Sequence, residues 1–208
     1  MYYFNGILGE VDDVACHTGV GDATWPVLIC LLGGFRVLKG GRPVPLHGSK
    51  AEVLLRCLGL HHQQPVARDL LLETMWPSHA LDLAGQSLNS LMYSLRKSLG
   101  DHVGGDAPVL HEDGYYRLNW EAGVGVDVAC FESLIKAGDK CVLTNQLSTA
   151  VSFYVQATEF YRGDLCAGAD INSMIARERL RVHFLTVLAR LADYYFLVKE
   201  YGRCLQRT

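Results

Sequence analysis

The stretch that most constrains the fold of this chain is residues 82–100, DLAGQSLNSLMYSLRKSLG, because its apolar residues recur at helical spacing. They form one stripe, made of Ala84, Leu88, Leu91, Met92, Leu95 and Leu99. A globular domain buries such a stripe. At about 100° per residue, the opposite face carries Gln86, Ser90, Tyr93 and Lys97, with Asn89 and Arg96 on one flank. We therefore expect one amphipathic helix with an exposed polar face.

The exposed face has the chemistry that reading a DNA major groove requires. Its side chains can donate and accept hydrogen bonds, stack on other rings and neutralise phosphate. Any surface helix also has a polar outer face, so this stretch alone favours an ordinary surface helix. The elements on either side of the helix therefore decide between the two interpretations.

Three strands are predicted before this helix. The apolar runs 27–32 (VLICLL) and 35–38 (FRVL) are followed by Gly40-Gly41 and then by residues 42–46. Gly-Gly after such a run predicts a two-residue hairpin, because both central positions can adopt positive φ. Pro43 and Pro45 lack the amide hydrogen that a central strand needs, so we expect the third strand at a sheet edge.

Two shorter helices and a second hairpin complete the pattern. The first helix begins at Ser49, with Glu52 three residues later in the spacing of a capping box, and Pro65 lies beyond its end. The second helix covers residues 67–76 and is stopped by Pro77. After the helix at 82–100, Asp113-Gly114 between the runs 108–110 and 115–118 predicts a hairpin.

The order of these elements is that of a winged helix-turn-helix, an α+β fold. In this plan the third helix enters the major groove, and the hairpin, called the wing, lies along the neighbouring DNA backbone. His111 and Arg117 of the predicted wing can reach phosphate. A solvated hairpin accounts for these two side chains equally well, so both interpretations stay open.

Several short motifs within residues 31–119 occur in the order found in a known family. These motifs are Leu32-Gly33 with Phe35 and Val37, Gly41-Arg42-Pro43, Trp76-Pro77, Leu95-Arg96-Lys97 with Leu99-Gly100, and Asp113-Gly114-Tyr115 with Leu118. On this combination the chain resembles the OmpR-type winged helix at the start of bacterial transcriptional activators of the SARP (Streptomyces antibiotic regulatory protein) kind.

The resemblance implies a second, all-α domain of TPR-like helix pairs, the bacterial transcriptional activator domain (BTAD), after the wing. Residues 126–128 and Phe131 resemble its beginning, with Asp127 as the expected N-cap. The long helix expected around residues 175–198 resembles the first half of the family's TPR array. Because a TPR array buries its faces by stacking several repeats, we expect a truncated array here.

These interpretations divide the chain into three parts. Residues 1–26 form a tail or a short strand with no assigned function. Residues 27–121 form the OmpR-type winged helix-turn-helix, which is the expected DNA-binding domain. Residues 122–208 form the expected BTAD. The expected fold class is thus an α+β winged helix-turn-helix followed by an all-α TPR-like helical domain.

The function that the resemblance implies is that of a sequence-specific, DNA-binding transcriptional activator. The family binds double-stranded DNA at direct repeats in promoters, often as head-to-tail dimers, and contacts RNA polymerase. The helix 82–99 would then read the major groove. The candidate DNA-binding residues are Gln86, Asn89, Ser90, Tyr93, Arg96 and Lys97 on this helix, and His111 and Arg117 on the wing. Related domains present the loop 77–81 to the polymerase, which implies this role for Ser78 and His79.

Charge favours DNA binding less than the motifs do. The chain of 208 residues has a formal net charge of −3, and residues 33–118 carry nine Lys and Arg against eight Asp and Glu. Many relatives have more arginine on the third helix, where this chain has Asn89 and Ser94. We expect low non-specific affinity for DNA. The alternative is a protein-interaction or regulatory module that keeps the winged-helix fold without reading DNA.

Motifs for catalysis and for metal binding are lacking in the sequence. It contains no H-E-x-x-H, no G-x-S-x-G and no phosphate-binding loop, so we expect no enzyme and no cofactor. His61 and His62 are adjacent at a helix end and point about 100° apart, which suits a single metal ion poorly.

The cysteines and the apolar runs suggest the compartment. The seven cysteines are scattered at positions 16, 30, 57, 130, 141, 166 and 204, as expected for reduced thiols. The longest apolar run, residues 27–32, is too short to span a bilayer, and the first residues lack the pattern of a signal peptide. We therefore expect a cytoplasmic protein with no membrane partner.

Overall fold

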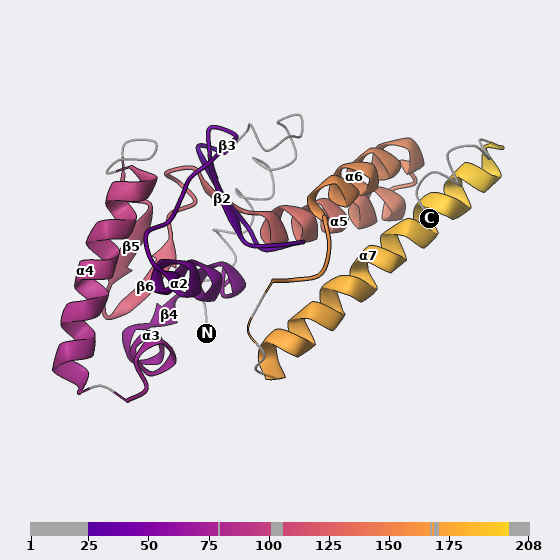
Figure 1. Ribbon diagram of the computed structural model, residues 1–208. Coiled ribbons are helices and arrows are strands. Elements are labelled where there is room, and N and C mark those ends of the chain that lie inside the picture. The colour runs from indigo at the N-terminus through magenta and orange to yellow at the C-terminus, as the bar shows by residue number, and fades with distance from the viewer. Residues whose placement is uncertain (1–24, 79, 101–105, 167, 169–170, 200–208) are drawn as a thin grey trace. The chain divides into compact units, whose positions relative to one another are not determined.

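In the computed structural model the chain divides into two compact units, and the structure describes residues 25–78, 80–100, 106–166, 168 and 171–199. The first unit comprises residues 25–31 and 35–126 (Figure 1). The second unit comprises residues 32–34 and 127–199. The tail expected at residues 1–26 lies outside the described residues, except for Trp25 and Pro26.

A four-stranded sheet opens the first unit, with the strand order β3-β2-β1-β7. Its strands are β1 (Val27–Cys30), β2 (Arg36–Lys39), β3 (Arg42–Pro43) and β7 (Val124–Val126). Gly40 and Gly41 connect β2 to β3 with φ values of 54° and 75°, which confirms the hairpin predicted from Gly-Gly. Pro43 lies in the edge strand, as the missing amide hydrogen requires.

Three helices follow the meander, and they pack against one another beside a second sheet. They are α2 (Ser49–Leu60), α3 (Arg68–Met75) and α4 (Leu81–Leu99). Each helix buries one face, as its apolar spacing predicted. The buried leucines of α2 and α3 are Leu54, Leu55, Leu58, Leu71 and Leu72. The third helix of the predicted order is α4, so the helix-turn-helix consists of α3, residues 76–80 and α4.

The capping box expected at the start of α2 is wrong. Gly48 is the N-cap residue, with a φ of 84°, and no side chain caps the helix. Ser49 is instead the first residue inside the helix. Glu52 forms an ion pair with Arg56 one turn further along α2, which engages the carboxylate expected to reach back to the N-cap.

The second sheet contains the wing and has the strand order β4-β6-β5. Its strands are β4 (Val66–Ala67), β5 (Val109–Glu112) and β6 (Tyr115–Leu118). Asp113 and Gly114 have φ values of 51° and 80° between β5 and β6, which confirms the second predicted hairpin. Strand β4 was not predicted, because a pair of residues is too short to show alternation.

The strand β7 extends the first unit past its expected end. Residues 122–126 were expected in the helical domain, but Val124–Val126 pairs in parallel with β1, with Val27 opposite Val124. The division between the two units falls between Val126 and Asp127. The pairing joins segments almost a hundred residues apart, and the three residues of β7 alone show no period that would reveal it.

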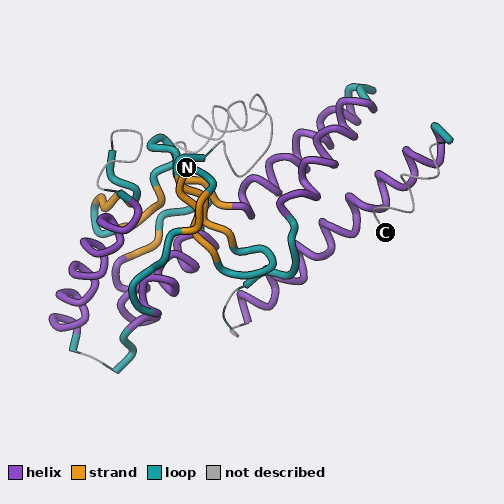
Figure 2. Tube along the Cα trace, turned by 45° about the horizontal axis from the view of Figure 1, so that its top comes forward, coloured by secondary structure: helices purple, strands orange, loops and turns teal. Residues whose placement is uncertain are grey.

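In the second unit the elements are helices: α5 (Asp127–Leu143), α6 (Leu147–Phe160) and α7 (Ile171–Leu197). From Asp127 onward the described residues form these helices and the loops between them, apart from an isolated bridge between Leu32 and Leu165 (Figure 2). The Asp127 carboxylate accepts hydrogen bonds from the Val128 amide at 2.8 Å and the Leu32 amide at 2.9 Å. Asp127 therefore ties residues 32–34 to the start of α5.

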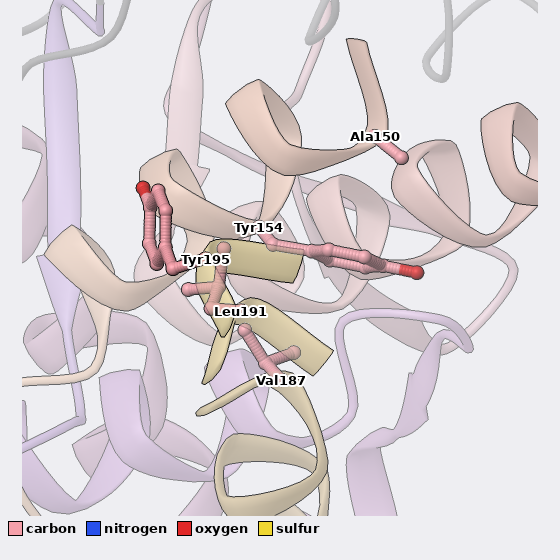
Figure 3. Close-up of a cluster of buried hydrophobic side chains, with 5 residues drawn as sticks. All are labelled: Ala150, Tyr154, Val187, Leu191 and Tyr195. Carbon is pink, nitrogen blue, oxygen red and sulfur yellow. The ribbon is translucent and has the colours of Figure 1, made fainter. Parts of the chain in front are cut away.

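Side chains of α6 and α7 form one apolar cluster in the core of the second unit, and Ile135 and Cys141 of α5 pack against it. Its buried residues are Ala150 and Tyr154 of α6 and Val187, Leu191 and Tyr195 of α7 (Figure 3). A further row of apolar side chains on α7 is exposed, including Ile171, Met174, Ile175, Val182 and Leu185. None of the helices in the described part of the chain is long and apolar enough to cross a bilayer.

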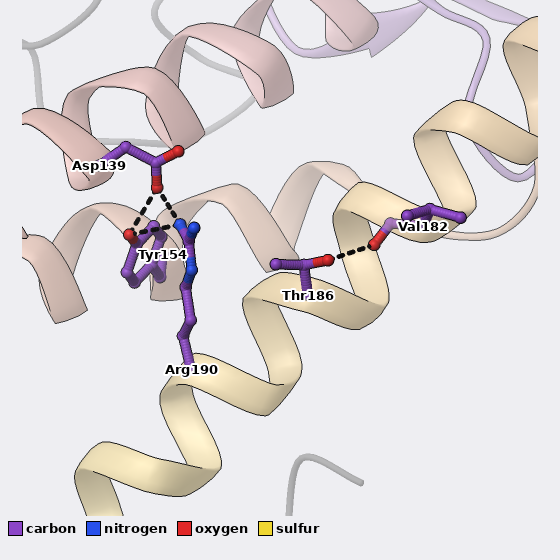
Figure 4. Close-up of polar contacts among 5 residues, drawn as sticks. All are labelled: Asp139, Tyr154, Val182, Thr186 and Arg190. Carbon is purple, nitrogen blue, oxygen red and sulfur yellow. Dashed lines mark hydrogen bonds and ion pairs between the residues drawn. The ribbon is translucent and has the colours of Figure 1, made fainter.

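A polar cluster links α5, α6 and α7 beside this core (Figure 4). The Tyr154 hydroxyl donates a hydrogen bond to Asp139 Oδ1 at 2.6 Å and accepts one from Arg190 Nη1 at 2.8 Å. Arg190 also forms an ion pair with Asp139. Burial, followed by the hydrogen bond and the negative charge of Asp139, raises the pKa of Tyr154 to about 12, although Arg190 opposes this shift.

Candidate nucleic-acid interface

The outer face of α4 is the candidate interface, and the apolar stripe of the helix orients it. Leu88 and Leu99 are fully buried, and Ala84, Met92 and Leu95 are at most 5% exposed. Leu91, which was expected in this stripe, is only half-buried, because it lies at the edge of the apolar arc. Because five of its side chains are buried in the core, the rotation of α4 about its own axis is fixed. Its polar residues therefore lie on the side away from the core.

The residues predicted on the outer face lie where the periodicity placed them. Gln86, Asn89, Ser90, Tyr93 and Lys97 are exposed, and Tyr93 is 71% exposed although it is aromatic. The hydroxyl of Ser90 donates to the Gln86 carbonyl at 3.0 Å, so Ser90 is turned back onto its own helix. The outer face therefore presents two amides, one phenol and one ammonium group to the surroundings.

Arg96 is less available than its neighbours. It is half-buried, and its Nε atom is buried without a hydrogen-bond partner in the described part of the chain. Arg96 and Lys97 lie in the last turn of α4, and Asp82 lies in the first. This arrangement matches the helix dipole, so the same charges also stabilise α4 without any ligand.

Sequence reasoning missed two basic residues that lie beside α4. A Cβ atom built on Gly100 would lie 2.8 Å from Lys39 Nζ, which places the ammonium group of Lys39 at the C-terminal end of α4. Lys39 thus joins Arg96 and Lys97 at this end of the helix. The charge of Lys39 was visible in the sequence, but its position depends on the packing of β2 beside α4.

Arg68 is the second missed residue. Its guanidinium group lies directly against Gly85 of α4, where a Cβ atom would collide with it. Its backbone amide donates to the Gly114 carbonyl at the wing turn, at 2.8 Å. Arg68 therefore connects the start of α3, the backbone of α4 and the wing. A glycine inside a helix costs stability and often marks such a close approach, so Gly85 was the available signal.

The two predicted wing residues lie on opposite faces of the hairpin. His111 is opposite Tyr116, and the two rings stack at 4.2 Å between centroids. Arg117 is opposite Leu110, one position further along, and successive strand residues point to opposite faces. His111 is exposed and Arg117 is half-buried. A straight DNA backbone that lies against one face of the wing would therefore contact either His111 or Arg117, but not both.

The loop between α3 and α4 is described in part. Ser78 is exposed, whereas His79 lies outside the described residues. Among the described residues no group of three His, Cys, Asp or Glu side chains is arranged to hold a metal ion. The chemistry that the described residues of this surface offer is hydrogen bonding, ring contact and a small positive charge.

The fold defined by these elements is a winged helix-turn-helix unit followed by a helical unit. Among solved structures the chain is similar to Mycobacterium tuberculosis EmbR, solved in complex with a low-affinity phosphopeptide, with a TM-score of 0.70 and 20% sequence identity. The match covers 86% of this chain and 48% of the EmbR chain, so the present chain spans about half of EmbR. At this identity the likeness concerns the fold. No family model matches the sequence, and no curated protein matches it.

Proposed function

We propose that this protein is a DNA-binding transcriptional regulator of the SARP type that inserts α4 into the major groove. The observation that carries the proposal is the outer face of α4, where Gln86, Asn89 and Tyr93 are exposed beside Lys97. This helix has the position of the recognition helix in a winged helix-turn-helix. The likeness of the fold to Mycobacterium tuberculosis EmbR is compatible with the proposal.

The residues of the site divide by chemistry. Gln86, Asn89 and Tyr93 are neutral and exposed, and they precede Arg96 and Lys97, so they lie closer to the N-terminal end of α4 that enters the groove. We therefore assign them to base edges. Arg96 and Lys97 contact phosphate, and Ser90 contributes a hydroxyl on the same face. On the wing, His111 or Arg117 contacts the neighbouring backbone. Because the positive charge is small, the non-specific affinity for DNA is low. Binding of a second copy of the protein raises the affinity for the target site.

The remaining parts of the proposal concern activation. Two copies bind head to tail on direct repeats in a promoter, and the loop with Ser78 and His79 contacts RNA polymerase. The helical unit is a BTAD with TPR-like helix pairs, in which α5 and α6 form the first pair. The assignments to DNA and polymerase rest on the family resemblance of residues 31–119, and the exposure of Ser78 is compatible with them. The assignment of the helical unit rests on the resemblance of residues 126–131 and of the long helix α7.

A selection from a random duplex library tests the proposal. The full chain is incubated with the library at low salt, and the bound duplexes are sequenced over several rounds. We expect a short enriched motif. The matched variant replaces Gln86, Asn89 and Tyr93 with Ala, and its circular dichroism and melting should equal those of the parent because all three side chains are exposed. A folded variant that enriches the same motif as strongly would refute the role of α4.

The near-neutral charge favours a second candidate function. A formal net charge of −3 is unusual for a protein that binds a polyanion. An interaction module with a winged-helix fold would bind protein in place of DNA. In the library selection this function leaves no duplex bound at low salt, for the parent and the variant alike.

A further inference from the structure

The distribution of charge along the outer face of α4 limits which bases it can read. From Leu81 to Ser94 the helix contains no lysine and no arginine, and its one charged residue is Asp82. The cations of α4 are confined to Arg96 and Lys97 in the last turn. The part of a recognition helix that usually reaches the bases is its N-terminal part. In this protein that part is neutral or acidic.

Guanine and adenine require different side chains in the major groove. Guanine presents two acceptors, O6 and N7, and is read by the paired donors of arginine or by lysine. Adenine presents the N7 acceptor beside the N6 donor, which matches the donor and acceptor of one Gln or Asn amide. Asp82 can only accept hydrogen bonds when ionised, so it cannot pair with the acceptors of guanine.

Gln86 and Asn89 are the amides available for this purpose. Both are exposed, and within the described part of the chain neither side-chain amide takes part in a hydrogen bond. They are three residues apart, which separates them by about 4.5 Å along the helix axis, slightly more than one base-pair step of about 3.4 Å. Two amides at this spacing can reach adenines at neighbouring base pairs.

Tyr93 adds an apolar contact on the same face. It lies seven residues after Gln86, two turns further along, so the two side chains project in nearly the same direction. Its ring is 71% exposed, at a position where most helices carry a polar side chain. The 5-methyl group of thymine is the apolar feature of the major groove, and aromatic side chains contact it.

Arg68 brings a guanidinium group against this part of α4, but its placement makes it unsuited to base reading. It lies against the backbone at Gly85, and Gly85 is buried. Gly85 is about 100° around the helix from Gln86, toward the packed side. Arg68 is therefore a positioning residue that holds α4 and the wing together.

We propose that α4 reads a short run of A·T base pairs, with adenines opposite Gln86 and Asn89 and a thymine methyl group against Tyr93. This inference rests on the proposed function and specifies its target. Over the span from Gln86 to Tyr93, about 10 Å of helix, the run covers about three to four base pairs. Replacing one contacted A·T pair with G·C weakens binding by about fivefold to 150-fold.

The library selection with the full chain separates failure of the proposed function from failure of the base assignment. We expect an enriched core of three to four A·T pairs. Failure of the parent to retain any duplex at low salt would refute the proposed function itself. An enriched core of G·C pairs opposite α4, or binding without base preference, would leave DNA binding standing and overturn the inference. Arg68→Ala is the control, because its loss should lower affinity without changing the preferred bases.

Two single-group changes test the individual contacts. Asn89→Arg should change the preference from adenine to guanine at one base pair and leave the others unchanged. Replacing the contacted thymine with uracil removes only the methyl group and should weaken the parent about threefold to fivefold. The Tyr93→Ala variant should not distinguish thymine from uracil. If Asn89→Arg keeps the parental motif, or the uracil duplex binds the parent as tightly as the thymine duplex, the assigned contact is wrong.

Discussion

Truncation of Leu88 to alanine tests the orientation of α4, on which the whole interface depends. Leu88 is 0% exposed, so the substitution removes three buried carbon atoms and leaves a cavity in the core. Fully buried Leu→Ala changes cost about 2–5 kcal/mol, as the sum of lost transfer free energy and the cavity. Leu91 is only half-buried, so Leu91→Ala should cost roughly 1 kcal/mol, because truncation there removes less apolar surface that is shielded from water.

The tryptophans provide an assay for the first unit alone. All three, at positions 25, 76 and 120, belong to the first unit. Urea unfolding followed by tryptophan fluorescence therefore reports the free energy of unfolding of the winged helix without the helical unit, and the slope m shows whether the transition keeps its cooperativity. We expect the midpoint of Leu88→Ala to fall well below that of Leu91→Ala.

A comparison of the free energies of unfolding of the two variants can refute the assigned orientation of α4. Equal losses for Leu88→Ala and Leu91→Ala would mean that both side chains are equally buried. The stripe would then be rotated toward Leu91, and the polar residues would not lie where the interface requires. The folded fraction of Leu88→Ala should keep the base preference of the parent, because Leu88 lies on the buried face of α4, opposite the face that carries Gln86 and Tyr93.

Three further outcomes are expected. Replacing Arg96 or Lys97 with Ala should weaken binding to all duplexes alike and reduce the slope of log affinity against log salt by about one for each phosphate that is no longer neutralised, measured by fluorescence anisotropy. Because the folded pKa of Tyr154 is raised to about 12 from 10.0, its contribution to stability is complete below pH 10 and is lost as the pH rises from 10 toward 12. The urea midpoint by circular dichroism, which reports the helices of both units, should fall in that window relative to the tryptophan midpoint of the first unit. It should fall less steeply in Tyr154→Phe, and identical slopes for the two proteins would contradict this. Replacing Ser78 and His79 with Ala should leave DNA binding intact and lower transcription in a reconstituted assay, whereas unchanged transcription would remove this loop from the mechanism.

Local chemistry in the sequence determined most of the first unit. The spacing of Ala84, Leu88, Met92 and Leu95 predicted α4 and its buried face, because a helix repeats every 3.6 residues whatever surrounds it. Gly40-Gly41 and Asp113-Gly114 predicted two hairpins, since few other residue pairs tolerate positive φ. The exposure of Gln86, Asn89 and Tyr93 follows from the same periodicity.

Only the tertiary structure decided how distant segments meet. The parallel pairing of β7 with β1, the addition of β4 to the wing sheet and the binding of the Leu32 amide by Asp127 involve one to three residues each, too few for any period to appear. The contact of Arg68 with Gly85 depends on the angle between α3 and α4, and that of Lys39 with the end of α4 depends on how β2 packs. Packing determines such contacts. The burial of many apolar side chains fixes the course of the backbone, and the backbone in turn determines which polar groups lie close together.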